Sequence, residues 1–483
     1  MGQNIYHQHF SAKDFLLHKQ KISTEFSHLE NWFKKQPLEN QQQIPTQVLK
    51  AGFELEVYLV DNNHLPCAEN KQFLQQLQHP SVIAELANFN VEINSSVREV
   101  KNNIFSDFEK ELKHIWALCQ KTASRKNQSV CMTGILPSLE KKHLTIDNMS
   151  KLKRYHAINE QILKTRQGKT IHLDICGKDS LHVQQHDVML EAVTTSLQLH
   201  LQLPFAQATR YYNSAIILSA PLVAICANSP FLFGKDLWQE TRIPAFEQSI
   251  ASGGYAGAAF GPIKRAGFGE AYVKQSLLEC FAENIEHYPI LLAELFPDPK
   301  EKLSHLLLHN GTIWRWTRPL IGLEKDGQYH LRLEHRSMPA GPSIVDCIAN
   351  AALFYGILHS LASQYKIAEQ HLPFNLAKDN FYTAAKFGLD CKIHWLDNNK
   401  ISIKKLFMQQ LLPMAKDGLS SLGVARSDID YYLNIIQQRL NTQQTGAIWQ
   451  QNYLQKHHCN MQQLVKAYIN RQQSGKAVYE WEI

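Results

Sequence analysis

The chain has 483 residues, 44% of them hydrophobic and 19% charged, a composition that excludes a wholly disordered protein. The formal net charge is +6, without dense runs of lysine and arginine interleaved with aromatic residues, so a dedicated nucleic-acid-binding protein is disfavoured. The nine cysteines include no CxxC pair, which argues against a disulfide framework or a zinc ribbon and favours a reducing, cytoplasmic setting.

The hydrophobic pattern predicts a central region between two helical flanks. Residues 1–46 are predicted to be helical, because apolar residues recur at helical spacing from Ile22 to Phe33. Residues 47–355 form the central region, and residues 356–483 return to a helical pattern and are expected to pack on it. The first ten residues lack the basic and apolar regions of a signal peptide.

Residues 213–234 contain no charged side chain and are numerous enough to span a bilayer. They also contain Pro221 and Pro230, which interrupt a helix and mark a turn. We therefore interpret this stretch as a buried helix followed by a turn, and we expect no membrane span.

Four segments of the central region alternate between apolar and polar residues, the pattern of a strand with one buried face. They are GFELEVYLV at 52–60, FNVEINS at 89–95, VTTSLQLHLQL at 193–203 and HLRLEHR at 330–336. Strands of a parallel sheet are buried on both faces and would be continuously apolar. These half-polar strands instead predict an antiparallel sheet in an α+β fold.

The polar positions of these strands carry side chains that are unusual for strands, because glutamate is normally depleted there. They are Glu54, Glu56, Glu92, Gln198, His200, Arg332, Glu334 and Arg336. One interpretation is a solvated face with incidental charges. If the faces converge instead, the carboxylates need cations, because like charges raise one another's pKa. Oxygen ligands with one imidazole suit Mg²⁺ or Mn²⁺, and arginines hold phosphate or carboxylate. We favour this second interpretation, a metal-dependent phosphoryl-transfer site.

A glycine-rich segment follows at 251–269 (ASGGYAGAAFGPIKRAGFG), with Lys264 and Arg265 inside it. Such a segment is either a flexible loop that closes over an anion or a linker without a ligand role. It matches neither a Walker A nor a Rossmann pattern. In the first case, Lys264 and Arg265 are candidates for binding nucleotide or substrate.

Six segments, in this order along the chain, resemble the glutamate–cysteine ligase family, in the bacterial branch of carboxylate–amine ligases related to glutamine synthetase. They are GFELE (52–56), FNVEIN (89–94), LEAVTTSLQLHLQLP (190–204), ANSPFLFGKDLWQETRIPAFEQ (227–248), HNGTIWRWTRP (309–319) and LRLEHRSMPAGPSIVD (331–346). The resemblance implies a curved antiparallel sheet that forms a funnel with helices packed around it. ATP would bind at one end of the funnel and amino acids at the other.

The resemblance also implies roles for single residues. Glu56 and Glu92 would bind the metal near the substrate carboxylate. Glu54, His200 and Glu334 would bind the metals at the nucleotide phosphates.

Further residues are implied to contact the substrates. Arg336 would stabilise the transferring phosphoryl group, and Arg242 would contact an anionic group of substrate or nucleotide. Gln198, Arg332 and Arg318 are further candidates for binding substrate or nucleotide, and Trp314 and Trp316 for shaping the substrate end.

The implied reaction is ATP-dependent amide formation through an acyl phosphate, with Mg²⁺ or Mn²⁺ as the metal. Glutamate and cysteine, as in glutathione biosynthesis, are the default substrates. A catalytically silent scaffold that binds metal or nucleotide remains an alternative, and so does a guanidino-type phosphotransferase. The intact set of five metal-ligand candidates favours the ligase. The sequence leaves open the identity of both substrates and the role of residues 356–483, and it is compatible with a homo-oligomer.

Overall fold

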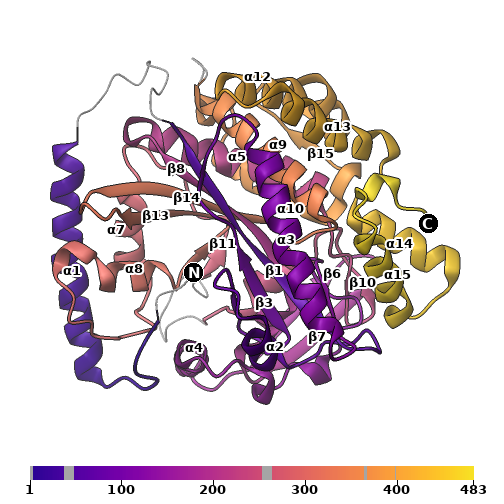
Figure 1. The fold of residues 1–483 in the computed structure, drawn as a ribbon. Helices are drawn as coiled ribbons and strands as arrows, with labels where there is room; N and C mark the ends of the chain where they lie inside the picture. Colours follow the sequence, from indigo (N-terminus) through magenta and orange to yellow (C-terminus); the bar gives the residue numbers. More distant parts are fainter. Residues whose placement is uncertain (1–3, 37–47, 253–263, 364–366, 398) are drawn as a thin grey trace.

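A curved antiparallel sheet forms the centre of the molecule (Figure 1). The computed structural model describes residues 4–36, 48–252, 264–363, 367–397 and 399–483. Within these residues the sheet has eight strands: in spatial order β13 (Thr317–Leu323), β14 (Tyr329–Pro339), β8 (Ser196–Leu203), β1 (Lys50–Val60), β3 (Asn90–Asn94) and β2 (Val82–Ala84), with β4 (Arg98–Glu99) and β5 (Ser129–Cys131) paired to β1. Their pairings are antiparallel, which confirms the predicted α+β fold.

All four strands predicted from apolar–polar alternation are present, as β1, β3, β8 and β14. Strand β8 begins at Ser196, later than predicted, because the residues before it form a 3₁₀ helix, η3 (Val188–Val193). Asp187 caps this helix by accepting a hydrogen bond from the backbone N–H of Met189. The alternation therefore located the strands correctly, and it overran the start of β8 by three residues and each end of β3 by one.

Three helices cover the apolar face of the sheet: α3 (Ile104–Ser124), α5 (Ala208–Cys226) and α9 (Ile344–Ser363). Phe108 of α3 packs on Phe53 of β1, with 5.3 Å between the ring centroids. The Tyr355 hydroxyl of α9 donates to the carbonyl oxygens of Gly52 and His200. Helix α5 is the buried helix expected within residues 213–234, and a short hairpin, β9 (Phe231–Leu232) and β10 (Lys235–Asp236), follows it as the expected turn.

One helix among the described residues, α9, has the length and apolar composition needed to cross a membrane. However, 94% of its most apolar window is buried inside the protein. An all-round apolar helix in such surroundings is typical of the core of a large globular protein.

The carboxyl-terminal region forms further helices, drawn in orange and yellow in Figure 1. They are α10 (Phe374–Phe387), α11 (Ile403–Leu406), α12 (Leu412–Ser421), α13 (Arg426–Thr442), α14 (Gly446–His457) and α15 (Met461–Gln473), with the hairpin β15 (Lys392–His394) and β16 (Lys400–Ser402). The expected boundary between residues 355 and 356 falls inside α9. A buried ion pair, Arg439 Nη2 to Asp346 Oδ1 at 2.7 Å, also joins α13 to α9.

The amino-terminal helix α1 (Ala12–Lys35) begins with a capping box at Ser11 and packs on α8 (Ser304–Asn310). Its predicted apolar positions Ile22 and Phe33 are buried. A buried carboxylate, Glu25, accepts hydrogen bonds from the backbone and side chain of His305 in α8. Residues 37–46 of the expected helical flank lie outside the described residues.

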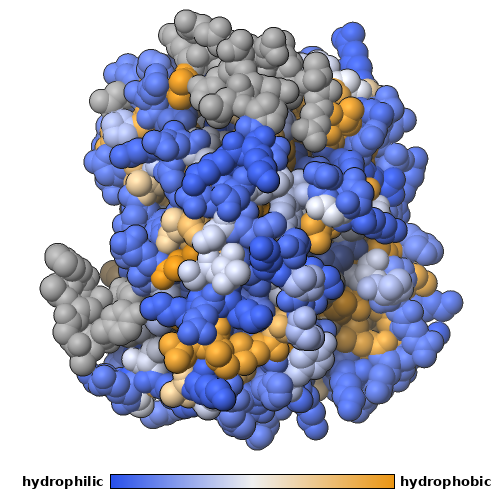
Figure 2. Space-filling model, turned by 90° about the vertical axis from the view of Figure 1, so that its left-hand side faces the viewer, coloured by the Kyte–Doolittle hydropathy of each residue, from blue (hydrophilic) through white to orange (hydrophobic). Residues whose placement is uncertain are grey.

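The remaining helices and strands are not part of the central eight-stranded sheet. They are α2 (Asn70–Leu77), α4 (Lys153–Thr165), β6 (Ile171–Cys176), β7 (Ser180–Gln185), α6 (Arg242–Ser249), β11 (Ala266–Gly267), α7 (Leu278–His287) and β12 (Trp314–Arg315). Seen from the side of α1, the surface is mostly hydrophilic, with hydrophobic side chains in small separate groups (Figure 2). This distribution is typical of a surface in contact with water.

Candidate active site

The sheet register brings the predicted ligand residues together. Glu56 of β1 lies directly opposite Glu92 of β3. His200 of β8 lies opposite Glu334 of β14, and Arg318 of β13 lies opposite Glu334 on the other side. Directly opposed side chains of an antiparallel pair are close enough to interact.

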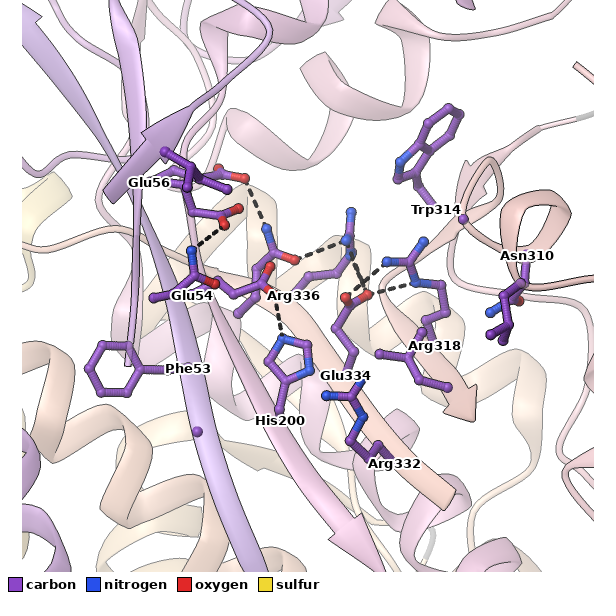
Figure 3. A pocket seen from close by; sticks show the side chains of 18 of the residues that line it. Phe53, Glu54, Glu56, His200, Asn310, Trp314, Arg318, Arg332, Glu334 and Arg336 are labelled. Carbon is purple, nitrogen blue, oxygen red and sulfur yellow. Dashed lines mark hydrogen bonds and ion pairs between the residues drawn. The ribbon is translucent and has the colours of Figure 1, made fainter. Parts of the chain in front are cut away.

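The polar side chains of these strands line one large cavity (Figure 3). Its volume is about 1490 Å³, which exceeds the usual size of a pocket for one small ligand. The face that the sequence left as either solvated or convergent is therefore convergent. Glu54 and Glu92 are only 9% and 3% exposed.

The first group of ligand residues, the histidine cluster, consists of Glu54, His200 and Glu334. One ligand atom from each lies within 4.8 Å of the others. Burial raises the pKa of Glu54, but the adjacent His200 imidazole outweighs burial and holds the pKa of this carboxyl below its ordinary value. The distance from His200 Nε2 to Glu54 Oε1 is 3.3 Å.

Glu334 lies between two arginines (Figure 3). Arg318 donates to both of its oxygens, from Nε at 2.7 Å and from Nη2 at 2.9 Å, and Arg336 Nε donates at 3.1 Å. Burial raises the pKa of Glu334, but the two guanidinium groups outweigh burial and hold the pKa well below its ordinary value. This carboxylate therefore stays ionised inside the protein.

The second group, the glutamate cluster, consists of Glu56, Glu85 and Glu92, again with ligand atoms within 4.8 Å of one another. Burial and repulsion by Glu92 raise the pKa of Glu56 to about 7. Burial and repulsion by Glu56 and Glu191 raise the pKa of Glu85 to about 7. For Glu92, burial and two neighbouring carboxylates raise the pKa well above its ordinary value.

A chain of hydrogen bonds connects the two clusters. Gln198 Nε2 donates to Glu56 Oε1 at 2.9 Å, and Gln198 Oε1 accepts from Arg336 Nη2 at 2.9 Å. Arg336 in turn donates to Glu334. Gln198 and Arg336 therefore lie between the glutamate cluster and the histidine cluster.

Both clusters fit divalent cations. Burial and mutual repulsion raise the pKa values of the glutamate cluster despite the nearby guanidinium groups of Arg336 and Arg154, and a bound cation would favour the ionised carboxylates. Oxygen ligands are the choice of Mg²⁺ and Mn²⁺, and both accept an occasional imidazole.

Two further candidates from the sequence line the cavity, Arg332 and Trp314. Arg242 does not line it. Its buried guanidinium group donates to Glu240 and to the backbone carbonyl oxygens of Arg336 and Ser337. In this structure backbone acceptors and Glu240 occupy these donors, and the expected contact with a ligand stays a prediction.

Trp316 is also buried outside the cavity. The centroid of its ring lies 5.2 Å from the guanidinium carbon of Arg242. The two cationic candidates of the glycine-rich segment do not line the cavity either. Arg265 is buried and donates to the carbonyl oxygens of Thr312 and Pro289, while Lys264 is exposed. Residues 253–263 of that segment lie outside the described residues.

Among the cavity residues that the sequence analysis did not single out are Glu85, Arg154 and Glu191, which lie at or beside the glutamate cluster. Glu85 follows β2, a strand too short to show alternation. Arg154 lies in the first turn of α4 and Glu191 in η3, so neither belongs to a strand.

The sequence profile of glutamate-cysteine ligase family 2 (GCS2) matches residues 50–475. The chain belongs to this family. The match includes most of the carboxyl-terminal helical region, in which the sequence analysis found no family motif. A search of curated protein sequences returns no significant match.

Solved structures with the same fold include a glutamate–cysteine ligase and a bifunctional glutathione synthetase. A glutamate–cysteine ligase from Francisella tularensis, solved in complex with AMP, has a TM-score of 0.53 and 11% identity, with 90% of both chains covered. A bifunctional glutathione synthetase from Pasteurella multocida has a TM-score of 0.55 and 11% identity, with 95% of this chain and 54% of that longer chain covered. Family and fold together support an ATP-dependent carboxylate–amine ligase.

Proposed function

We propose that this protein is an ATP- and Mg²⁺-dependent ligase that joins the side-chain carboxylate of glutamate to the amino group of cysteine, or a related γ-glutamyl ligase. The observation that carries the proposal is the pair of cation-binding clusters in one cavity, bridged by Gln198 and Arg336. The free thiols of all nine cysteines support a reducing cytoplasm as its location, where γ-glutamylcysteine synthesis would serve glutathione formation.

The two clusters suit different parts of the reaction. The histidine cluster would hold metal at the nucleotide phosphates, and the glutamate cluster would hold metal at the carboxylate to be activated. The metal ions would neutralise the phosphate charge and orient both reactants. Arg336 lies between the clusters, where its guanidinium group would stabilise the phosphoryl group during transfer.

The reaction needs no nucleophile from the protein. A carboxylate oxygen of the acid attacks the terminal phosphorus of ATP, and ADP leaves. The nitrogen of the amine substrate, after losing a proton, then attacks the acyl carbon, and phosphate leaves with the C–O bond electrons. The cavity holds the reactants together and excludes water, which would otherwise hydrolyse the acyl phosphate.

We propose supporting roles for the remaining arginines. Arg318 orients Glu334 through its two-point contact. Arg242 positions the backbone that carries Arg336, because it donates to the carbonyl oxygens of Arg336 and Ser337. Arg332 lines the cavity and would bind a nucleotide phosphate there, whereas the contacts of Arg265 suit a structural role.

The test is Mg²⁺-dependent release of ADP from ATP across a panel of amino acids, singly and in pairs, with mass spectrometry of the products. ADP together with a condensation product that has lost water supports the ligase and names both substrates. ADP with a phosphorylated product and no amide supports a phosphotransferase instead. Nucleotide binding without ADP release for any pair supports a silent scaffold.

The Glu334→Gln variant makes this test specific to the site. It removes one charge from the histidine cluster without opening a cavity, so turnover should fall by at least about 100-fold, the usual size of such a loss at a metal site. The exposed Glu286→Gln is the matched control, because its side chain is 75% exposed. Normal turnover of Glu334→Gln would contradict the proposed role of the cluster.

A further inference from the structure

The cavity contains a pair of opposite charges that the proposed metal sites do not use. Arg154 of α4 and Glu191 of η3 both line the cavity beside the glutamate cluster. Glu191 repels the carboxylate of Glu85, and Arg154 attracts the carboxylates of both Glu85 and Glu191. Both residues are therefore within electrostatic reach of the cluster that would hold the reacting carboxylate.

Within the described part of the chain, the carboxylate of Glu191 accepts no hydrogen bond and forms no ion pair. The guanidinium group of Arg154 makes no ion pair with these residues either. It lies 5.6 Å from the centroid of the Tyr155 ring, and its Nε atom is buried without an acceptor among the described residues. A buried charged donor without an acceptor is costly, so it normally has a ligand or water as its partner.

The two elements that carry the pair are held in place by polar contacts. Asn159 of α4 accepts a hydrogen bond from the backbone N–H of Val188 in η3, at 3.0 Å. Tyr155, next to Arg154, donates its hydroxyl to Glu85 at 3.2 Å. The distance between the pair and the glutamate cluster is therefore set by the fold before any ligand binds.

The carboxylate of Glu191 lines the cavity and, among the described residues, accepts no hydrogen bond. A cation placed against this carboxylate would favour its ionised form. An ammonium group is such a cation, and it is small enough to enter the cavity with a substrate.

We propose that Arg154 and Glu191 bind the α-carboxylate and the α-ammonium group of the acid substrate, so that its side-chain carboxylate points to the glutamate cluster. This inference rests on the proposed ligase function and assigns recognition of the two α-groups of its acid substrate to Arg154 and Glu191. It also explains why the side-chain carboxylate would be phosphorylated and not the α-carboxylate, since Arg154 would hold the α-carboxylate away from the reacting position.

The test compares three acids that differ by one charged group each. Glutarate lacks the α-ammonium group of L-glutamate, and 4-aminobutyrate lacks its α-carboxylate. Hydroxylamine serves as the amine for all three, so that hydroxamate formation measures only the use of the acid. The native protein should use L-glutamate at least about 100-fold better than either analogue, the usual effect of one lost charged hydrogen bond in a buried site.

Each substitution should remove the preference for L-glutamate over only one of the two analogues. Glu191→Gln should reduce kcat/KM for L-glutamate by about 100-fold and leave glutarate within about threefold. Arg154→Met should do the same for L-glutamate and spare 4-aminobutyrate. The exposed Lys151→Met, three residues before Arg154, and Glu286→Gln are the matched controls.

Equal losses for all three acids would overturn the inference, because such losses indicate a role in folding or metal binding. An unchanged preference for L-glutamate in both variants would also overturn it. If the native protein forms no hydroxamate, the proposed ligase function fails instead. Calorimetric titration of L-glutamate and glutarate in the presence of Mg²⁺ then still tests the pair, since tighter binding of L-glutamate must depend on Glu191.

Discussion

Replacing Glu85 by glutamine is expected to stabilise the metal-free protein while weakening its binding of Mg²⁺. Burial, Glu56 and Glu191 raise the pKa of Glu85 from an ordinary 4.5 to about 7. Since one pKa unit corresponds to about 1.4 kcal/mol, the ionised Glu85 costs the metal-free fold ~3 kcal/mol at pH 8. The amide keeps the size of the side chain and removes the charge.

The sign of the pH dependence follows from proton binding. Between pH 4.5 and 7 the folded state holds a proton on Glu85 that the unfolded state has released. The stability of the metal-free native protein therefore decreases as pH rises through this range, and levels off above it. The advantage of Glu85→Gln should be small at pH 4.5 and reach its full size by pH 8.

Urea unfolding in EDTA at several pH values measures the stability difference, and the same experiment in Mg²⁺ measures the coupling to metal. Added Mg²⁺ should stabilise the native protein more than the variant. Glu286→Gln, on the exposed surface, should change neither quantity. A metal-free Glu85→Gln protein that is less stable than the native one at pH 8 would refute the reasoning, because its carboxylate would then be compensated within the fold.

Two further predictions concern the packing of the carboxyl-terminal helices. Arg439→Met leaves the buried Asp346 without its ion-pair partner, so the free energy of unfolding in urea should fall by about 3–5 kcal/mol. A loss below about 1 kcal/mol would contradict this. Gly418→Ala brings a methyl group of α12 against the backbone of Gly356 in α9. The melting temperature of this variant should therefore fall, although alanine favours a helix over glycine by about 1 kcal/mol. A higher melting temperature would show that the two helices separate easily.

The strands and five of the ligand candidates were predictable because alternation fixes which side chains share a face. Once β1 and β8 are strands, Glu54, Glu56, Gln198 and His200 must lie on one side of the sheet. The alternation does not predict the order of the strands in the sheet. That order places His200 beside Glu334, two residues far apart in the sequence.

The residues that the sequence analysis missed or misjudged share a physical cause. Glu85, Arg154 and Glu191 reach the cavity from a strand end, a helix and a 3₁₀ turn, and only tertiary structure directs them there. The anion contact expected of Arg242 came from the family resemblance, and that of Arg265 from its place in the glycine-rich segment. Their donors instead serve backbone carbonyl oxygens, which no pattern in the sequence marks.

The two clusters differ in how much of the chain they need. The glutamate cluster uses residues between positions 56 and 92, which meet through neighbouring strands β1 and β3. The histidine cluster joins positions 54 and 334, so its ligands meet only after β14 has paired with β8. Because contacts between distant parts of a chain form slowly, the first cluster can assemble early during folding and the second must wait for most of the chain. Cation binding at the two clusters would therefore report on different stages of folding.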